Sequence, residues 1–150
     1  MTLSQSFSIL FYYVSPFWLL MIAFPNRGIT KKIMGSYIPF IPLSGLYIYY
    51  LLATTDAASL AGTFSLQLSE YVKLYSQDAG ALGVTIHFVA MDLFVGRWIY
   101  WQGQEKNIWT IHSLILCLSF GPVGLLSHII TAYFSKEASD STKSKTDATV

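Results

Sequence analysis

Apolar residues occupy four long stretches of the chain, and short polar segments separate them. The stretches cover about residues 7–24, 34–53, 81–101 and 108–134. A membrane-spanning helix uses about 20 predominantly apolar residues, so each stretch is long enough to cross a bilayer. The pattern predicts an all-α fold, an integral membrane bundle of four transmembrane helices that forms one domain over residues 1–135.

Proline interrupts two of these predicted spans. Pro39 and Pro42 lie in the first half of the second span, and that half is therefore expected to be kinked or partly unwound. A Gly-Pro-Val-Gly sequence at residues 121–124 lies in the middle of the fourth span. The fourth span is accordingly predicted to be tilted or broken.

Residues 56–79 and the end of the chain differ in kind from the spans. Between spans two and three, apolar residues recur at helical spacing among polar ones: Leu60, Phe64, Leu68, Tyr71, Val72 and Tyr75. This spacing predicts an amphipathic helix that is too polar to span and that lies in the interface or caps the bundle. Residues 136–150 are rich in Ser, Thr, Lys and Asp, which predicts a disordered polar tail.

Composition supports a membrane protein and excludes several classes. Of the 150 residues, 53% are hydrophobic and only 11% are charged, against about 25% charged in ordinary soluble domains. So few charges leave apolar surface that needs membrane lipid as its partner. A net charge of +1 argues against a nucleic-acid binder, which would carry a concentrated basic face. The single cysteine, Cys117, cannot form an internal disulfide.

Charge gives a weak prediction of orientation. The loop after the first span carries Arg27, Lys31 and Lys32, and the positive-inside rule places this loop and the loop after span three in the cytoplasm or stroma. In a four-span chain both termini then lie on the opposite side. The lysines of the tail, Lys136, Lys143 and Lys145, argue for the other orientation.

Asp92 is the first candidate functional residue. It lies near the middle of the third span, where a carboxylate costs roughly 2.5–3.5 kcal/mol on insertion scales. Ionisable residues at such positions usually face the bundle interior and mark function. The alternative is that Asp92 is protonated or paired and only joins helices through hydrogen bonds.

His87 and Arg97 complete the candidate site. Each lies five residues from Asp92, so neither shares one ideal helix face with it, and the alternative for Arg97 is that it extends to the interface. His87 and His128 are predicted in the leaflet opposite Arg97 and His112. Because these two imidazoles would lie roughly 9 Å out of register along the helices, a bis-histidine haem is not predicted.

The other motifs of enzyme chemistry are missing from the sequence. It contains no phosphate-binding loop, no GxGxxG, no HExxH and no GxSxG. The sequence therefore predicts no metal and no cofactor, and it assigns no cofactor-binding residue.

Several motifs resemble the ABA-deficient-four-like membrane family. They are His-Phe at 87–88, Met-Asp-Leu-Phe-Val-Gly-Arg-Trp-Ile-Tyr at 91–100, Pro-Phe-Trp-Leu-Leu at 16–20, Tyr-Ile-Pro at 37–39 and Gly-Pro-Val-Gly-Leu-Leu at 121–126. The resemblance covers nearly all of the chain up to Phe134. It implies a thylakoid or cyanobacterial plasma membrane, and the lack of an Arg- and Ser-rich transit peptide is typical of the cyanobacterial branch.

The resemblance also implies a function in carotenoid metabolism. Plant members of the family are needed to make the allenic carotenoid neoxanthin from the epoxide violaxanthin. An isomerase of this kind needs an acid and a base, for which Asp92 and His87 are the candidates, and Asp92 alone is preferred over the pair. The alternatives are an accessory to such an enzyme, a non-catalytic pigment-binding or structural subunit of a photosynthetic membrane complex, and, last, a small transporter.

Overall fold

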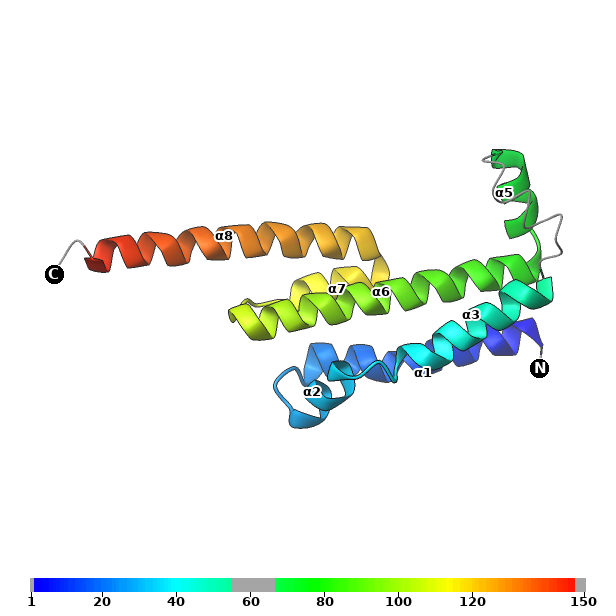
Figure 1. The fold of residues 1–150 in the computed structure, drawn as a ribbon, viewed down its shortest axis with the longest axis horizontal. Helices are drawn as coiled ribbons and strands as arrows, with labels where there is room; N and C mark the ends of the chain where they lie inside the picture. Colours follow the sequence, from blue (N-terminus) through cyan, green and yellow to red (C-terminus); the bar gives the residue numbers. More distant parts are fainter. Residues whose placement is uncertain (1, 55–66, 148–150) are drawn as a thin grey trace.

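The computed structural model describes residues 2–54 and 67–147, and all regular secondary structure in these ranges is α-helical. The predicted all-α fold class is therefore confirmed. In chain order the helices are α1 (Leu3–Ala23), α2 (Gly28–Gly35), α3 (Phe40–Thr54), α5 (Leu68–Tyr75), α6 (Asp78–Lys106), α7 (Ile111–Ser119) and α8 (Gly121–Asp147). Helices α1, α3 and α6 run side by side along the long axis of the molecule, and the start of α1 and the end of α8 lie at opposite ends of it (Figure 1).

Helices α1 and α6 are the two that are long and apolar enough to cross a membrane among the described residues. Thr2 and Gln5 form a capping box that starts α1, since each satisfies a backbone N–H that the first turn leaves without a partner. Only 28% of the apolar window in α1 and 22% of that in α6 is buried. The two helices thus expose most of their apolar surface, unlike the core helix of a soluble protein.

The second predicted span begins later than the sequence indicates. Helix α2 ends at Gly35 and α3 begins at Phe40, so the predicted unwinding around Pro39 is confirmed. Side chains of α6 hold the loop that precedes α2: the Tyr100 hydroxyl donates a hydrogen bond of 2.7 Å to the carbonyl oxygen of Pro25. A buried tyrosine needs such a partner for its hydroxyl, and this bond fixes α2 against the end of α6.

The break predicted in the fourth span, residues 108–134, is confirmed, and the chain reverses its direction there. Helix α7 ends at Ser119, α8 begins at Gly121, and the two helices pack against each other as an antiparallel hairpin. Pro122 supplies no N–H to α7 and has a fixed φ that suits the first turn of α8. Figure 1 shows α8 starting beside the middle of α6 and running back toward the C-terminal end of α6, near which α2 lies. Residues 111–135 therefore do not pass along the whole length of the bundle.

The close packing of α7 against α8 depends on Gly124. A Cβ atom at this position would lie 2.3 Å from the backbone nitrogen and 2.4 Å from the Cα of Cys117. Because the hairpin reverses direction, residues equally distant from the turn meet across it, as His112 and Thr131 do. Gly124 thus allows the backbones of α7 and α8 to approach more closely than any side chain would permit.

The amphipathic segment and the tail were each predicted as single elements. The first half of residues 56–79 lies outside the described residues, and the second half contains the short helix α5. Helix α8 continues to Asp147, so it extends through most of the segment for which we predicted a disordered tail. The physical reason is continuity, because a helix already nucleated by packing adds further residues at little cost.

Candidate functional site

Asp92 lies halfway along α6, against the turn between α7 and α8. A Cβ atom built on Gly121 would lie only 1.9 Å from the Oδ1 atom of Asp92, so the carboxyl group occupies the space that any other residue at 121 would fill. The side chain is half-buried. The backbone oxygen of Asp92 also faces the hairpin, and the Cys117 thiol donates to it over 3.6 Å.

The Asp92 carboxyl lies beside the first residue of α8, Gly121. The first turn of α8 offers it few free donors, because Pro122 has no N–H and the Val123 and Gly124 amides both donate to the Phe120 carbonyl oxygen. Among the described residues no hydrogen bond or ion pair engages the Asp92 carboxyl. It therefore remains open to a further partner.

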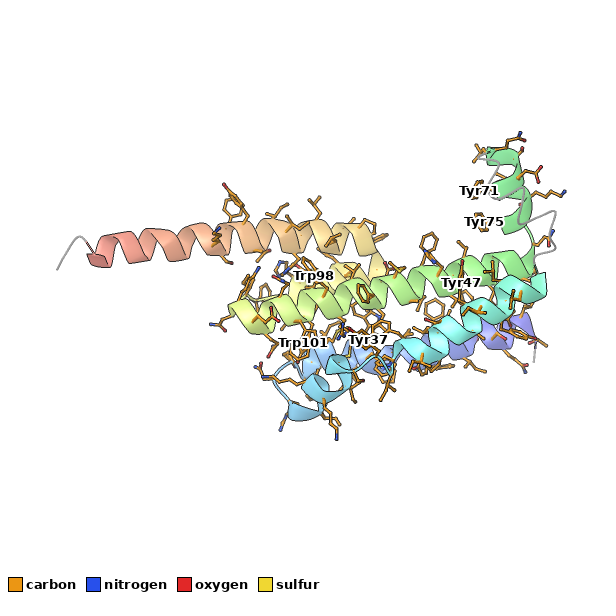
Figure 2. All side chains as sticks on the ribbon, viewed as in Figure 1. Tyr37, Tyr47, Tyr71, Tyr75, Trp98 and Trp101 are labelled. Carbon is orange, nitrogen blue, oxygen red and sulfur yellow. The ribbon has the colours of Figure 1, made fainter. Side chains whose placement is uncertain are left out.

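Arg97 lies five residues farther along α6, about one and a half turns, and faces α2. Its Nε donates a hydrogen bond to the carbonyl oxygen of Met34, and the Trp101 indole nitrogen donates to the same oxygen at 3.0 Å. The guanidinium carbon lies 5.0 Å from the centre of the Tyr37 ring, a cation–π distance. Tyr37 and Trp101 mark this end of α6 in Figure 2. Arg97 thus satisfies the carbonyl of the buried Met34 at the C-terminal end of α2, where a cation is favoured.

His87 lies on a third face of α6. Its ring centre is 5.7 Å from that of Tyr47 on α3, and its side chain is exposed. The structure therefore brings the three predicted site residues to three different neighbours: His87 to α3, Arg97 to α2 and Asp92 to the α7–α8 turn. No hydrogen bond or ion pair joins any two of them in the described part of the chain.

A polar cluster between α7 and α8 was not predicted as a site. The Nε2 atom of His112 lies 2.9 Å from the Thr131 hydroxyl and 3.1 Å from the Ser113 hydroxyl, which in turn lies 3.2 Å from the Ser127 hydroxyl. His128 packs on the Trp98 ring of α6. We call His112, Ser113, Ser127, His128 and Thr131 the histidine cluster.

The position of His128 corrects the predicted leaflet. A fourth span that crosses the membrane would place it in the same leaflet as His87, but the hairpin returns α8 toward the end of α6, so that His128 lies at the level of Trp98. Sequence spacing could have revealed the cluster only with the turn already known. Residues 112 and 131 are then nearly equidistant from the break at 121–122.

Comparison with known proteins identifies the family. The ABA DEFICIENT 4-like family matches residues 5–128, a range that includes Asp92, Arg97 and His87. The protein ABA DEFICIENT 4, chloroplastic, from Arabidopsis thaliana is 40% identical to this chain over 79% of its length. The matched region spans 56% of that relative, so the chain covers little more than half of it. No solved structure shows significant similarity. These matches, over most of the chain, establish that it belongs to the ABA DEFICIENT 4-like family.

Proposed function

We propose that the protein acts in carotenoid metabolism in a photosynthetic membrane, as a neoxanthin-synthase-like isomerase or as an accessory that presents an epoxy-carotenoid to one. The observation that carries this proposal is the 40% identity to the chloroplastic relative, in a family match that includes both Asp92 and Gly121. The half-buried Asp92 carboxyl supports it, because a group in the apolar part of the bundle can meet a substrate that is dissolved in lipid.

The chemistry balances with a single carboxyl group. A protonated Asp92 gives its proton to the epoxide oxygen as the carbon–oxygen bond breaks, which leaves a hydroxyl group and a cationic polyene. Loss of a proton from the neighbouring chain carbon then forms the allene. The Asp92 carboxylate, now a base, takes that proton and returns to its starting state. No atom is gained or lost, so the isomerisation needs no oxidant or reductant.

We further propose that the chain crosses the membrane three times, through α1, α3 and α6, and that α7 and α8 form a re-entrant hairpin. Helix α3 has 15 residues, which is about 22 Å of helix, and it lies against α6. With three crossings the tail lies on the same side as the loop after α1. Five of the exposed basic residues then share one side of the membrane, Arg27, Lys31, Lys32, Lys106 and Lys136, and Lys73 on α5 lies on the other. The predicted conflict between the loop and the tail lysines disappears, in keeping with the positive-inside rule.

Cysteine labelling tests this topology. The only native cysteine, Cys117, is buried, so the variants Ser4→Cys, Gly28→Cys and Lys136→Cys each report one exposed position. With a membrane-impermeant maleimide applied to sealed vesicles of known orientation, Gly28→Cys and Lys136→Cys are expected to react from the same side and Ser4→Cys from the other. Reaction of Lys136→Cys together with Ser4→Cys would show that residues 108–134 cross the membrane completely.

Deletion of the protein in its native host tests the proposed function. We expect one xanthophyll to disappear from the chromatographic pigment profile and its epoxide precursor to accumulate. The wild-type gene is expected to restore the profile, and Asp92→Asn to restore less than about 1% of the product, because general acid–base groups contribute typically 10²–10⁴-fold.

The matched control is Asp78→Asn, the same change at an exposed carboxyl in the first turn of α6. It is expected to restore the pigment profile fully. An unchanged profile after deletion would reject the carotenoid function. Full restoration by Asp92→Asn would instead retain carotenoid metabolism and favour a non-catalytic pigment-binding or structural subunit.

A further inference from the structure

The histidine cluster contains a buried imidazole whose hydrogen-bonding capacity is not used within the protein. His128 is only 1% exposed, and neither of its ring nitrogens has a hydrogen-bond partner among the described residues. The Nδ1 atom of the neighbouring His112 is likewise buried without a partner. Burying polar atoms without hydrogen bonds is costly, and native proteins rarely do so. Three imidazole nitrogens, one from α7 and two from α8, are thus available to a ligand.

The cluster favours a neutral ligand. Its other members, Ser113, Ser127 and Thr131, contribute hydroxyl groups that already bond to His112 or to each other. Among the described residues no ion pair involves the cluster, and no group of three His, Cys, Asp or Glu side chains could hold a metal ion. The neutral His128 ring offers one donor and one acceptor, and His112 adds its Nδ1 atom. A hydroxyl group, which both donates and accepts, is the matching ligand.

The surroundings of the cluster favour a ligand with an apolar body. Trp98 meets the His128 ring edge to face at 5.3 Å, and Trp109 stacks on the His112 ring at 4.8 Å. Both tryptophans are exposed, at 41% and 66%, and Figure 2 shows Trp98 projecting from α6 toward α8. The two indoles therefore lie between the histidines and the surroundings of the bundle. A molecule that arrives from the lipid phase meets aromatic rings first and the imidazole nitrogens behind them.

We propose that the histidine cluster binds the hydroxyl group of a hydroxylated apolar ligand that enters beside Trp98 and Trp109. The site is separate from Asp92, because His128 lies seven residues beyond Gly121, which is about 10 Å along α8. Water would satisfy the same nitrogens but would make no use of the two exposed indoles.

A pair of carotenoids that share one skeleton tests the proposal in the purified full chain in lipid nanodiscs. Zeaxanthin carries a hydroxyl group on each end ring, and β-carotene carries none; this choice of probes rests on the proposed function. Zeaxanthin is expected to raise the Tm of the wild-type protein by roughly 2–6 °C through preferential binding to the folded state, and β-carotene is expected to leave it within about 1 °C.

Two variants assign the effect to the cluster. His128→Leu removes both ring nitrogens and is expected to abolish the difference between the two carotenoids. Tyr49→Leu removes a polar ring that is 63% exposed on α3 and is expected to preserve it. Should His128→Leu not fold, His128→Gln, which keeps one donor and one acceptor, is expected to retain a reduced difference.

Three results would overturn the proposal. One is a wild-type Tm that responds equally to both carotenoids, and another is a zeaxanthin effect that survives in His128→Leu. The third is a structure of the nanodisc sample in which water alone contacts His128 in the presence of zeaxanthin. Each leaves the proposed carotenoid function to be judged by the deletion experiment, since that experiment measures pigments and not binding at this cluster.

Discussion

Replacing Gly124 with leucine is expected to lower the free energy of unfolding by about 3 kcal/mol or more, the upper part of the range for overpacked cores. A Cβ atom at this position would lie 2.3–2.5 Å from three atoms of Cys117, two of them in the backbone. Backbone atoms within a helix cannot move aside as a flexible side chain can. The hairpin therefore has to open, and the contact between Asp92 and Gly121 is lost with it.

Unfolding in mixed detergent micelles, followed by far-ultraviolet circular dichroism, measures this effect. The control is Gly83→Ala on α6, because a Cβ atom at Gly83 meets nothing within 4 Å. Alanine in a helix interior is favoured over glycine by roughly 0.5–1 kcal/mol, so the control is expected to be neutral or slightly stabilising. Equal stability of Gly124→Leu and the wild type would mean that α7 and α8 do not pack as a hairpin.

Replacing Trp18 with alanine is expected to cost about 3–5 kcal/mol, the range for large aromatic residues in cores. Trp18 on α1 is 4% exposed, and its ring fills the space over Gly96 on α6, where a Cβ atom would lie 2.5 Å from the indole. The variant removes a close contact between α1 and α6, the two helices that are long and apolar enough to cross a membrane. Because Gly96 has no side chain that could fill the space, the cavity cannot close by a local rearrangement.

The control for this prediction is Tyr12→Ala. Tyr12 also lies on α1 but is 79% exposed, so its removal leaves no internal cavity and is expected to cost less than about 1 kcal/mol. The same detergent unfolding measurement compares the two variants. A cost for Trp18→Ala no larger than that for Tyr12→Ala would show that the indole is not packed between α1 and α6.

The sequence predicted the helices correctly where the evidence lay within one stretch of residues, as with the long apolar runs and the prolines. The long stretches around residues 7–24 and 81–101 correspond to α1 and α6, since an apolar run of this length has few other solutions in a membrane. The prolines correctly marked the unwinding before Phe40 and the break at residues 121–124. These features depend on the covalent properties of each residue and its immediate neighbours.

The direction in which the chain continues after the break at residues 121–124 could not be predicted from the local sequence. A Gly-Pro sequence is compatible with a tilted continuation or with a reversal, and only the packing of Gly124 on Cys117 distinguishes the two. The reversal in turn moved His128 to the level of Trp98 and placed Gly121 against Asp92. The candidate residues were visible in the sequence, but their partners were not.

Sequence by itself determined that this is an all-α chain, that it belongs to the ABA DEFICIENT 4-like family, and that Asp92 is an acidic residue within an apolar helix. Tertiary structure alone decided that Asp92, His87 and Arg97 face three different helices, and that two histidines converge in the α7–α8 hairpin. The physical reason is the distance along the chain over which each effect acts. Hydrophobic patterning and proline act over a few residues, whereas the partner of a side chain depends on how closely distant backbones approach, which here is set by glycines at positions 96, 121 and 124.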